Sequence, residues 1–198
     1  MEAFLTSAML VAIAEIGDKT QLLSFVLAAR LRAPLPIIAG IFVATIFNHG
    51  LAGSVGVWLA QLIPPHWLPW ITGVVFIGFG LWALKPDTLD EQPKLHPAGA
   101  FVTTTTAFFL AEMGDKTQFA TIALGAQFQG ALVAVVVGTT LGMMLANIPA
   151  VLIGDRLAKQ LPLKQIRWLA AALFIVTGAV TIFGATTGIN QAQVQHAY

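Results

Sequence analysis

The 198-residue sequence has no cysteine and few charged residues, and each shortage excludes a class of protein. Without cysteine there is no disulfide, thiolate metal site or iron–sulfur cluster. Charged residues make up 10% of the chain, against about 25% in a typical soluble domain. A net charge of +1 and the lack of a basic run give no reason to expect a nucleic-acid partner. With 57% hydrophobic residues, the chain is expected to lie in a lipid bilayer.

Long apolar segments predict an all-α, polytopic membrane protein. A helix needs about 20 mainly apolar residues to cross a bilayer. We expect six membrane-spanning helices, at residues 3–28, 35–60, 67–84, 99–126, 131–153 and 167–188. No basic region precedes the first apolar segment, and that segment contains charged residues, so we do not expect it to be a cleaved signal peptide.

The basic residues between these segments predict how the chain crosses the membrane. Outside the two motifs described next, lysine and arginine occur only in the first, third and fifth connections. The positive-inside rule places these connections in the cytoplasm and both termini on the opposite side. The fifth connection, residues 155–167, is expected to be a basic loop.

One motif occurs twice: residues 15–21 read EIGDKTQ and residues 112–118 read EMGDKTQ. Each copy lies near the middle of an apolar segment, where ionisable residues are costly and usually face a protein-lined or watery cavity. Since an α-helix turns once in about 3.6 residues, the two acids of each copy are expected to share one helix face. These acids are Glu15, Asp18, Glu112 and Asp115.

The motif is part of a longer internal repeat. A shift of 97 residues superposes Phe4 on Phe101 and the first motif on the second. We therefore predict two three-helix halves, residues 1–84 and 99–198, joined by a cytoplasmic linker at 85–98. With three spans in each half, the second half would be inverted relative to the first. Inverted repeats that meet at a midplane site are a recurrent plan of secondary transporters, where they serve alternating access.

If the two motifs meet, they would form an oxygen-lined cation site. Four carboxylates would gather at one depth, and Ca²⁺, Mg²⁺ and Mn²⁺ prefer oxygen ligands. Carboxylates crowded together can take up protons when the cation leaves, which is the chemistry of cation/proton exchange. Neutral oxygen donors are expected from Thr20, Gln21, Thr117, Gln118, Asn48 and Asn147.

The small and basic residues of the motif leave alternatives open. Gly17 and Gly114 would allow either close helix packing or a helix break that frees carbonyls for coordination. Lys19 and Lys116 lie one turn beyond Glu15 and Glu112, where each would form an ion pair within its helix or take part in proton coupling with the glutamate. The motif threonines would either ligate the cation or bond back to their helix and bend it.

Polar residues of the second and fifth segments are expected near the motifs. His49 corresponds to Asn147 at a shift of 98 residues, and Asn48 precedes it. Such residues would either complete a cation shell or form hydrogen bonds between helices. His49 is not expected to act as a sole metal ligand. Pro149, deep inside the fifth segment, is expected to kink that helix.

The doubled motif E-x-G-D-[KR]-[TS] resembles that of Golgi-type Mn²⁺/Ca²⁺:H⁺ antiporters and bacterial manganese exporters, within the cation/Ca²⁺ exchanger superfamily. The resemblance covers nearly the whole chain and implies an inverted repeat with a cation site formed by Glu15, Asp18, Glu112 and Asp115. The compact length, without an additional leading span or targeting segment, resembles the bacterial branch and implies Mn²⁺ export across the inner membrane. The acids themselves would also accept Ca²⁺.

Two other functions fit parts of the pattern. A passive divalent-cation channel would use the same acids, but its flux would not respond to a pH gradient. An intramembrane aspartic protease would need Asp18 and Asp115 but not the glutamates. The sequence favours a secondary transporter over an enzyme, with no cofactor and with the lipid bilayer, a divalent cation and protons as its partners. It does not fix the oligomeric state, the stoichiometry or the role of the linker.

Overall fold

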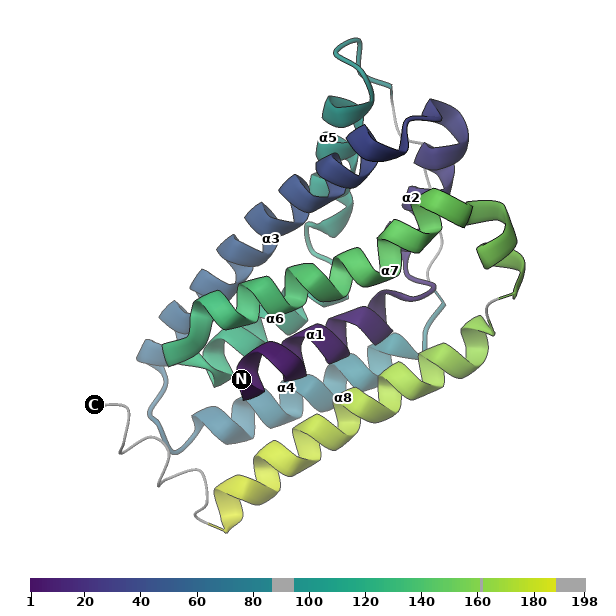
Figure 1. Ribbon diagram of the computed structural model, residues 1–198. Coiled ribbons are helices and arrows are strands. Elements are labelled where there is room, and N and C mark those ends of the chain that lie inside the picture. Colours follow the sequence, from purple (N-terminus) through teal and green to yellow (C-terminus); the bar gives the residue numbers. More distant parts are fainter. Residues whose placement is uncertain (87–94, 161, 188–198) are drawn as a thin grey trace.

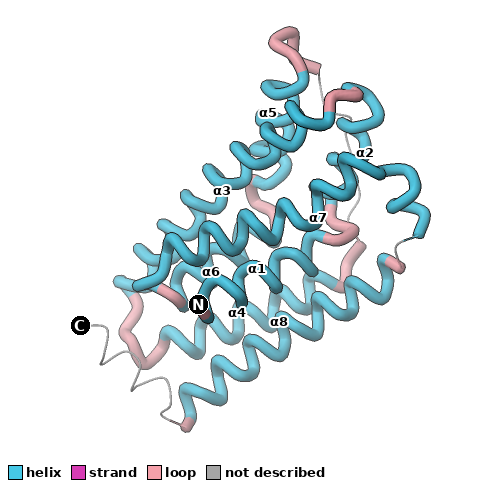
Figure 2. The backbone as a smooth tube through the Cα atoms, in the orientation of Figure 1, coloured by secondary structure: helices cyan, strands magenta, loops and turns pink. Residues whose placement is uncertain are grey.

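The computed structural model describes residues 1–86, 95–160 and 162–187, and the regular secondary structure of that part of the chain is all helical, as predicted (Figures 1 and 2). Most of the predicted linker at 85–98, and the polar tail after residue 187, lie outside the described residues. The elements are α1 (Glu2–Glu15), α2 (Lys19–Leu31), α3 (Pro34–Leu62), α4 (Leu68–Ala83), α5 (Ala100–Glu112), α6 (Lys116–Gln127), the 3-10 helix η1 (Gln129–Ala131), α7 (Leu132–Gln160) and α8 (Leu163–Thr186).

Three helical segments are long and apolar enough to cross a bilayer, judged by length and composition within the described residues. They are Pro34–Leu62, Gln129–Ile153 and Leu163–Thr186. Helix α4 is apolar as well but shorter. A soluble domain could not cover so much apolar helix surface, so the chain is an integral membrane protein.

The segments that carry the motifs, 3–28 and 99–126, are each two helices rather than one. Helices α1 and α2 are separated at Gly17, and α5 and α6 at Gly114. The φ angles of these glycines are +82° and +73°, a left-handed conformation that residues with a Cβ rarely adopt. The helix break is therefore the alternative that the structure adopts. The prediction that the two acids of a motif share one helix face is wrong, because the break lies between them.

Alanine at these two glycines should destabilise the protein, because a residue with a Cβ costs about 1–2 kcal/mol in the left-handed conformation. Gly17→Ala should lose more than Gly114→Ala: its Cβ would lie 2.9 Å from Leu163 Cδ2, whereas a Cβ at Gly114 meets open space. Gly78→Ala is the matched control, since Gly78 is helical and its Cβ also meets open space. Thermal unfolding in detergent should rank the midpoints Gly78→Ala, then Gly114→Ala, then Gly17→Ala; equal midpoints would contradict the argument.

The last third of α7 differs in part from its prediction. The helix is kinked, as expected, but its non-helical residue is Ile153, one turn after Pro149. Proline lacks an N–H donor and crowds the turn before it, so Pro149 does not account for a distortion one turn after it. The expected basic loop at 155–167 is wrong, because the end of α7 and the start of α8 make most of it helical.

The long helices α3 and α7 pack against each other and organise the remaining elements (Figure 1). Helices α1 and α2 pack on α7, whereas α5 and α6 pack on α3. Helices α4 and α8 pack on each other and lie beside α1 and α6. A Cβ at Gly56 of α3 would lie 2.1 Å from the Ile122 carbonyl oxygen, so α3 and α6 are in backbone contact there. This arrangement brings the two helix breaks together between α3 and α7.

Candidate cation site

Three of the four motif carboxylates meet where the two breaks face each other. Glu15, Glu112 and Asp115 each offer an oxygen within 4.8 Å of the others. Glu15 and Glu112 are the last residues of α1 and α5, and Asp115 caps the start of α6, accepting from the Thr117 N–H at 3.5 Å. Their exposed fractions are 0%, 2% and 4%. Buried carboxylates this close need a counter-charge or protons to be tolerated.

The lysines pair across the motifs. Lys19 Nζ lies 3.1 Å from Asp115 Oδ1, and Lys116 Nζ forms an ion pair with Asp18 Oδ1. The interpretation of an ion pair within one helix is therefore wrong, because each break turns the lysine away from the glutamate before it. Asp18, predicted as one of four clustered acids, lies apart from the group of three. The two crossed pairs connect the first motif to the second and place positive charge beside the carboxylates.

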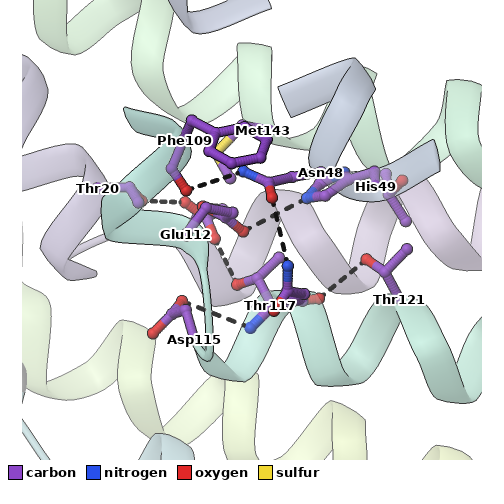
Figure 3. A network of polar contacts seen from close by, with 12 residues as sticks. Thr20, Asn48, His49, Phe109, Glu112, Asp115, Thr117, Thr121 and Met143 are labelled. Carbon is purple, nitrogen blue, oxygen red and sulfur yellow. Dashed lines mark hydrogen bonds and ion pairs between the residues drawn. The ribbon is translucent and has the colours of Figure 1, made fainter. Parts of the chain in front are cut away.

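Glu15 is held by a hydroxyl from each motif. Thr20 Oγ1 donates to Glu15 Oε2 and Thr117 Oγ1 donates to Glu15 Oε1, both at 2.5 Å. Both hydroxyls thus donate to the Glu15 carboxylate, and their role as cation ligands stays a prediction. Two motif threonines and three motif acids form one continuous set of oxygen atoms, and Figure 3 shows Thr20, Thr117, Glu112 and Asp115 within it.

The motif glutamines support the helix breaks. The Gly17 N–H donates to Gln21 Oε1 at 2.8 Å, and the Gly114 N–H donates to Gln118 Oε1 at the same distance. Gln21 Nε2 in turn donates to the Ala146 carbonyl at 2.9 Å, which ties the first break to α7. A buried N–H freed by a helix break must find such a partner. The amide oxygens that were expected near the cation are thus engaged by the backbone.

Both predicted asparagines form hydrogen bonds between helices. Asn48 Nδ2 donates to the Phe109 carbonyl at 3.2 Å, and its Oδ1 accepts from Gln118 Nε2 at 3.3 Å. Asn147 Oδ1 accepts from Ser24 Oγ at 2.6 Å, and its Nδ2 donates to a carbonyl one turn earlier in α7. These hydrogen bonds position the two broken helices against α3 and α7. Of the two roles considered, a cation ligand or a hydrogen bond between helices, the structure shows the hydrogen bonds.

His49, which the sequence placed near the motifs but not as a sole metal ligand, lies beside one carboxylate of the cluster. It is fully buried, and its Nε2 lies 3.4 Å from Glu112 Oε1 (Figure 3). Glu112 Oε2 is buried as well and has no hydrogen-bond partner among the described residues. A buried carboxylate oxygen without a partner costs free energy that a bound cation or proton would offset. Carboxylate and hydroxyl oxygens are the donors that hard divalent cations prefer.

The two breaks are covered differently. The Leu163 side chain of α8 lies against Gly17, whereas Gly114 faces open space and the neighbouring Met113 is 56% exposed. A small pocket opens beside the first break, lined by residues that include Asp18, Lys116 and Arg167. The surroundings of the carboxylates are thus asymmetric, although the two motifs are nearly identical.

Comparison with known proteins points to one family. A family model described as divalent cation/proton antiporter GDT1 matches the chain twice, at residues 3–91 and 100–189. A Vibrio cholerae protein named "Putative manganese exporter" is 51% identical over 183 residues, covering 92% of each chain. GDT1-like protein 5 of Arabidopsis thaliana is 27% identical over 217 residues, covering 90% of this chain and 94% of its own. No solved structure gives a significant match.

Proposed function

Since the chain belongs to the GDT1 family of divalent cation/proton antiporters, we propose that it exports divalent cations from the cytoplasm in exchange for protons. The relative named for manganese export favours Mn²⁺ as the substrate, with Ca²⁺ as the other ion that the oxygen ligands accept. The observation that carries the proposal is the meeting of three buried carboxylates at two facing helix breaks. The membrane would be the bacterial inner membrane.

In this proposal the motif acids alternate between the cation and protons. Glu15, Glu112 and Asp115 bind the ion, with the hydroxyls of Thr20 and Thr117 beside them. When the ion leaves, the glutamates take up protons, because buried carboxylates so close together are costly when all are charged. Protons and the cation then compete for the same oxygens, which couples their movement in opposite directions.

We propose further that the chain is an inverted repeat of two three-span halves. The family model matches each half separately, and each half has a broken helix, a long helix and a further apolar helix in the same order. Because three spans are an odd number, the halves would cross the membrane in opposite directions. The basic connections support a cytoplasmic linker at 85–98 and termini on the other side.

Alternating access would use the α4–α8 pair. These helices pack on each other and against α1 and α6, whereas α2 and α5 pack on α7 and α3. In the proposed orientation α1 and α6 form the outer half of the path to the carboxylates. The α4–α8 pair therefore covers the outer half of this path. If the pair moved toward α2 and α5, it would cover the inner half instead, and the cation site would be reached from the other side of the membrane.

Transport in proteoliposomes tests the proposal directly. An imposed pH gradient should drive Mn²⁺ against its own concentration gradient, and Mn²⁺ movement should in turn shift the internal pH, because the two ions use one site. Measurements with a Mn²⁺-quenched dye and a pH dye follow both fluxes. Glu2→Gln, at an exposed position of α1, is the matched control and should transport normally. Mn²⁺ flux that ignores the pH gradient would identify a passive channel instead.

A further inference from the structure

His49 brings a nitrogen donor to a site otherwise lined by oxygen. Its side chain is fully buried in α3, and its Nε2 faces Glu112 Oε1. Its Nδ1 is buried without a hydrogen-bond partner among the residues that the structure describes. Among the described residues, the contact with Glu112 is thus the polar contact that this buried imidazole makes.

The distance between the two side chains is long for a direct hydrogen bond and is compatible with two ligands of one ion. The His49 Nε2 to Glu112 Oε1 separation is 3.4 Å, beyond the usual range of about 2.7–3.2 Å for hydrogen bonds from nitrogen to oxygen. Two neighbouring ligands at right angles, each about 2.2 Å from one ion, would lie about 3.1 Å apart. The carboxylate oxygens are within 4.8 Å of one another, and ligands on opposite sides of such an ion would be about 4.4 Å apart.

The nitrogen donor comes from the first half of the chain alone. Asn147 occupies the corresponding position of the second half, and its side chain is already engaged. Its Oδ1 accepts from Ser24 Oγ at 2.6 Å and its Nδ2 donates to the Met143 carbonyl at 3.0 Å. His49 therefore departs from the repeat at a position that reaches a carboxylate of the cluster.

We propose that His49 Nε2 is a ligand of the transported cation, beside Glu112, and that it makes the site prefer Mn²⁺ over Ca²⁺. Imidazole is a good ligand for divalent transition metals, whereas Ca²⁺ takes oxygen ligands. An all-oxygen site would bind both ions, and one nitrogen shifts the balance toward Mn²⁺. This assignment rests on the proposed function, because it requires a cation at the carboxylates.

Pulsed electron paramagnetic resonance of Mn²⁺ bound to the purified protein tests the ligand. The wild-type spectrum should show coupling to a directly bound nitrogen, and His49→Asn should lose it. His66→Asn, at an exposed histidine, is the control and should keep the coupling. Mn²⁺ bound by the wild type without nitrogen coupling would overturn the assignment while leaving the proposed transport intact. The wild-type spectrum alone decides this outcome. If His49→Asn does not fold, His49→Gln serves as a second variant in which the nitrogen coupling should be lost.

Competition binding tests the preference. In His49→Asn the ratio of Mn²⁺ to Ca²⁺ affinity should fall about tenfold, through weaker Mn²⁺ binding with Ca²⁺ binding nearly unchanged. An equal loss for both ions would show that His49 only positions Glu112, and it would overturn the proposed preference. If the wild type binds neither ion, the cation site itself fails, and the ligand assignment fails with it.

Discussion

Glu15→Gln should abolish proton-driven Mn²⁺ transport, with initial rates in proteoliposomes reduced about a hundredfold or more. The substitution keeps the size of the side chain but removes both the charge and the group that exchanges protons. Glu15 is fully buried, and both of its oxygens accept short hydrogen bonds from Thr20 and Thr117. An amide can accept at only one of these positions, so the oxygen set around the cation is disrupted as well.

Two comparisons make this result specific. Glu2→Gln removes a carboxylate from an exposed position of the same helix and should leave the rate unchanged. Glu112→Gln should be as inactive as Glu15→Gln, because the two glutamates end equivalent half-helices and meet in one cluster. Both variants should elute from size exclusion like the wild type. Full transport by either glutamate variant would refute the carboxylate site.

The sequence predicted the features that depend on local pattern. Apolar length and composition are sufficient for an all-helical membrane protein, and a repeated heptapeptide is visible without coordinates. The helix break at Gly17 stayed one of two alternatives, because a glycine within a helix fits both close packing and a left-handed turn. The left-handed turn needs a hydrogen-bond partner for the Gly17 N–H, and Gln21 is that partner. Because a carbonyl of α7 orients Gln21, the choice between the two alternatives depends on a tertiary contact.

The arrangement of charges within the site could not be predicted, because it depends on the breaks. Spacing rules for ion pairs assume a continuous helix, so they connect Lys19 to Glu15 rather than to Asp115. The two nearly identical motifs also gave no reason to separate Asp18 from Asp115. The difference arises from tertiary packing, since α8 covers the first break and leaves the second open. For His49 the sequence predicted a position near the motifs, and its departure from the repeat, where the second half has Asn147, sets it apart.

Lys116→Met should destabilise the protein by about 3–5 kcal/mol, the usual cost of removing one partner of a buried ion pair. Lys116 and Asp18 are 6% and 1% exposed, so the aspartate would lose its lysine partner in a place with little access to water. Unfolding by sodium dodecyl sulfate in mixed micelles gives the free energy. Lys19→Met is the comparison: the Lys19 side chain is 26% exposed, so water already weakens its attraction to Asp115 and the loss should be smaller.

A second substitution separates the ion pair from mere packing. Asp18→Asn in the Lys116→Met background removes the remaining charge, so most of the lost stability should return, whereas a packing defect at residue 116 would persist in the double variant. The crossed pairs join the first motif to the second, so this coupling measures how firmly the two halves are held together at the site. A Lys116→Met protein as stable as the wild type would show that the pair contributes nothing. Simple additivity of the two substitutions would show that Asp18 and Lys116 do not act as a pair.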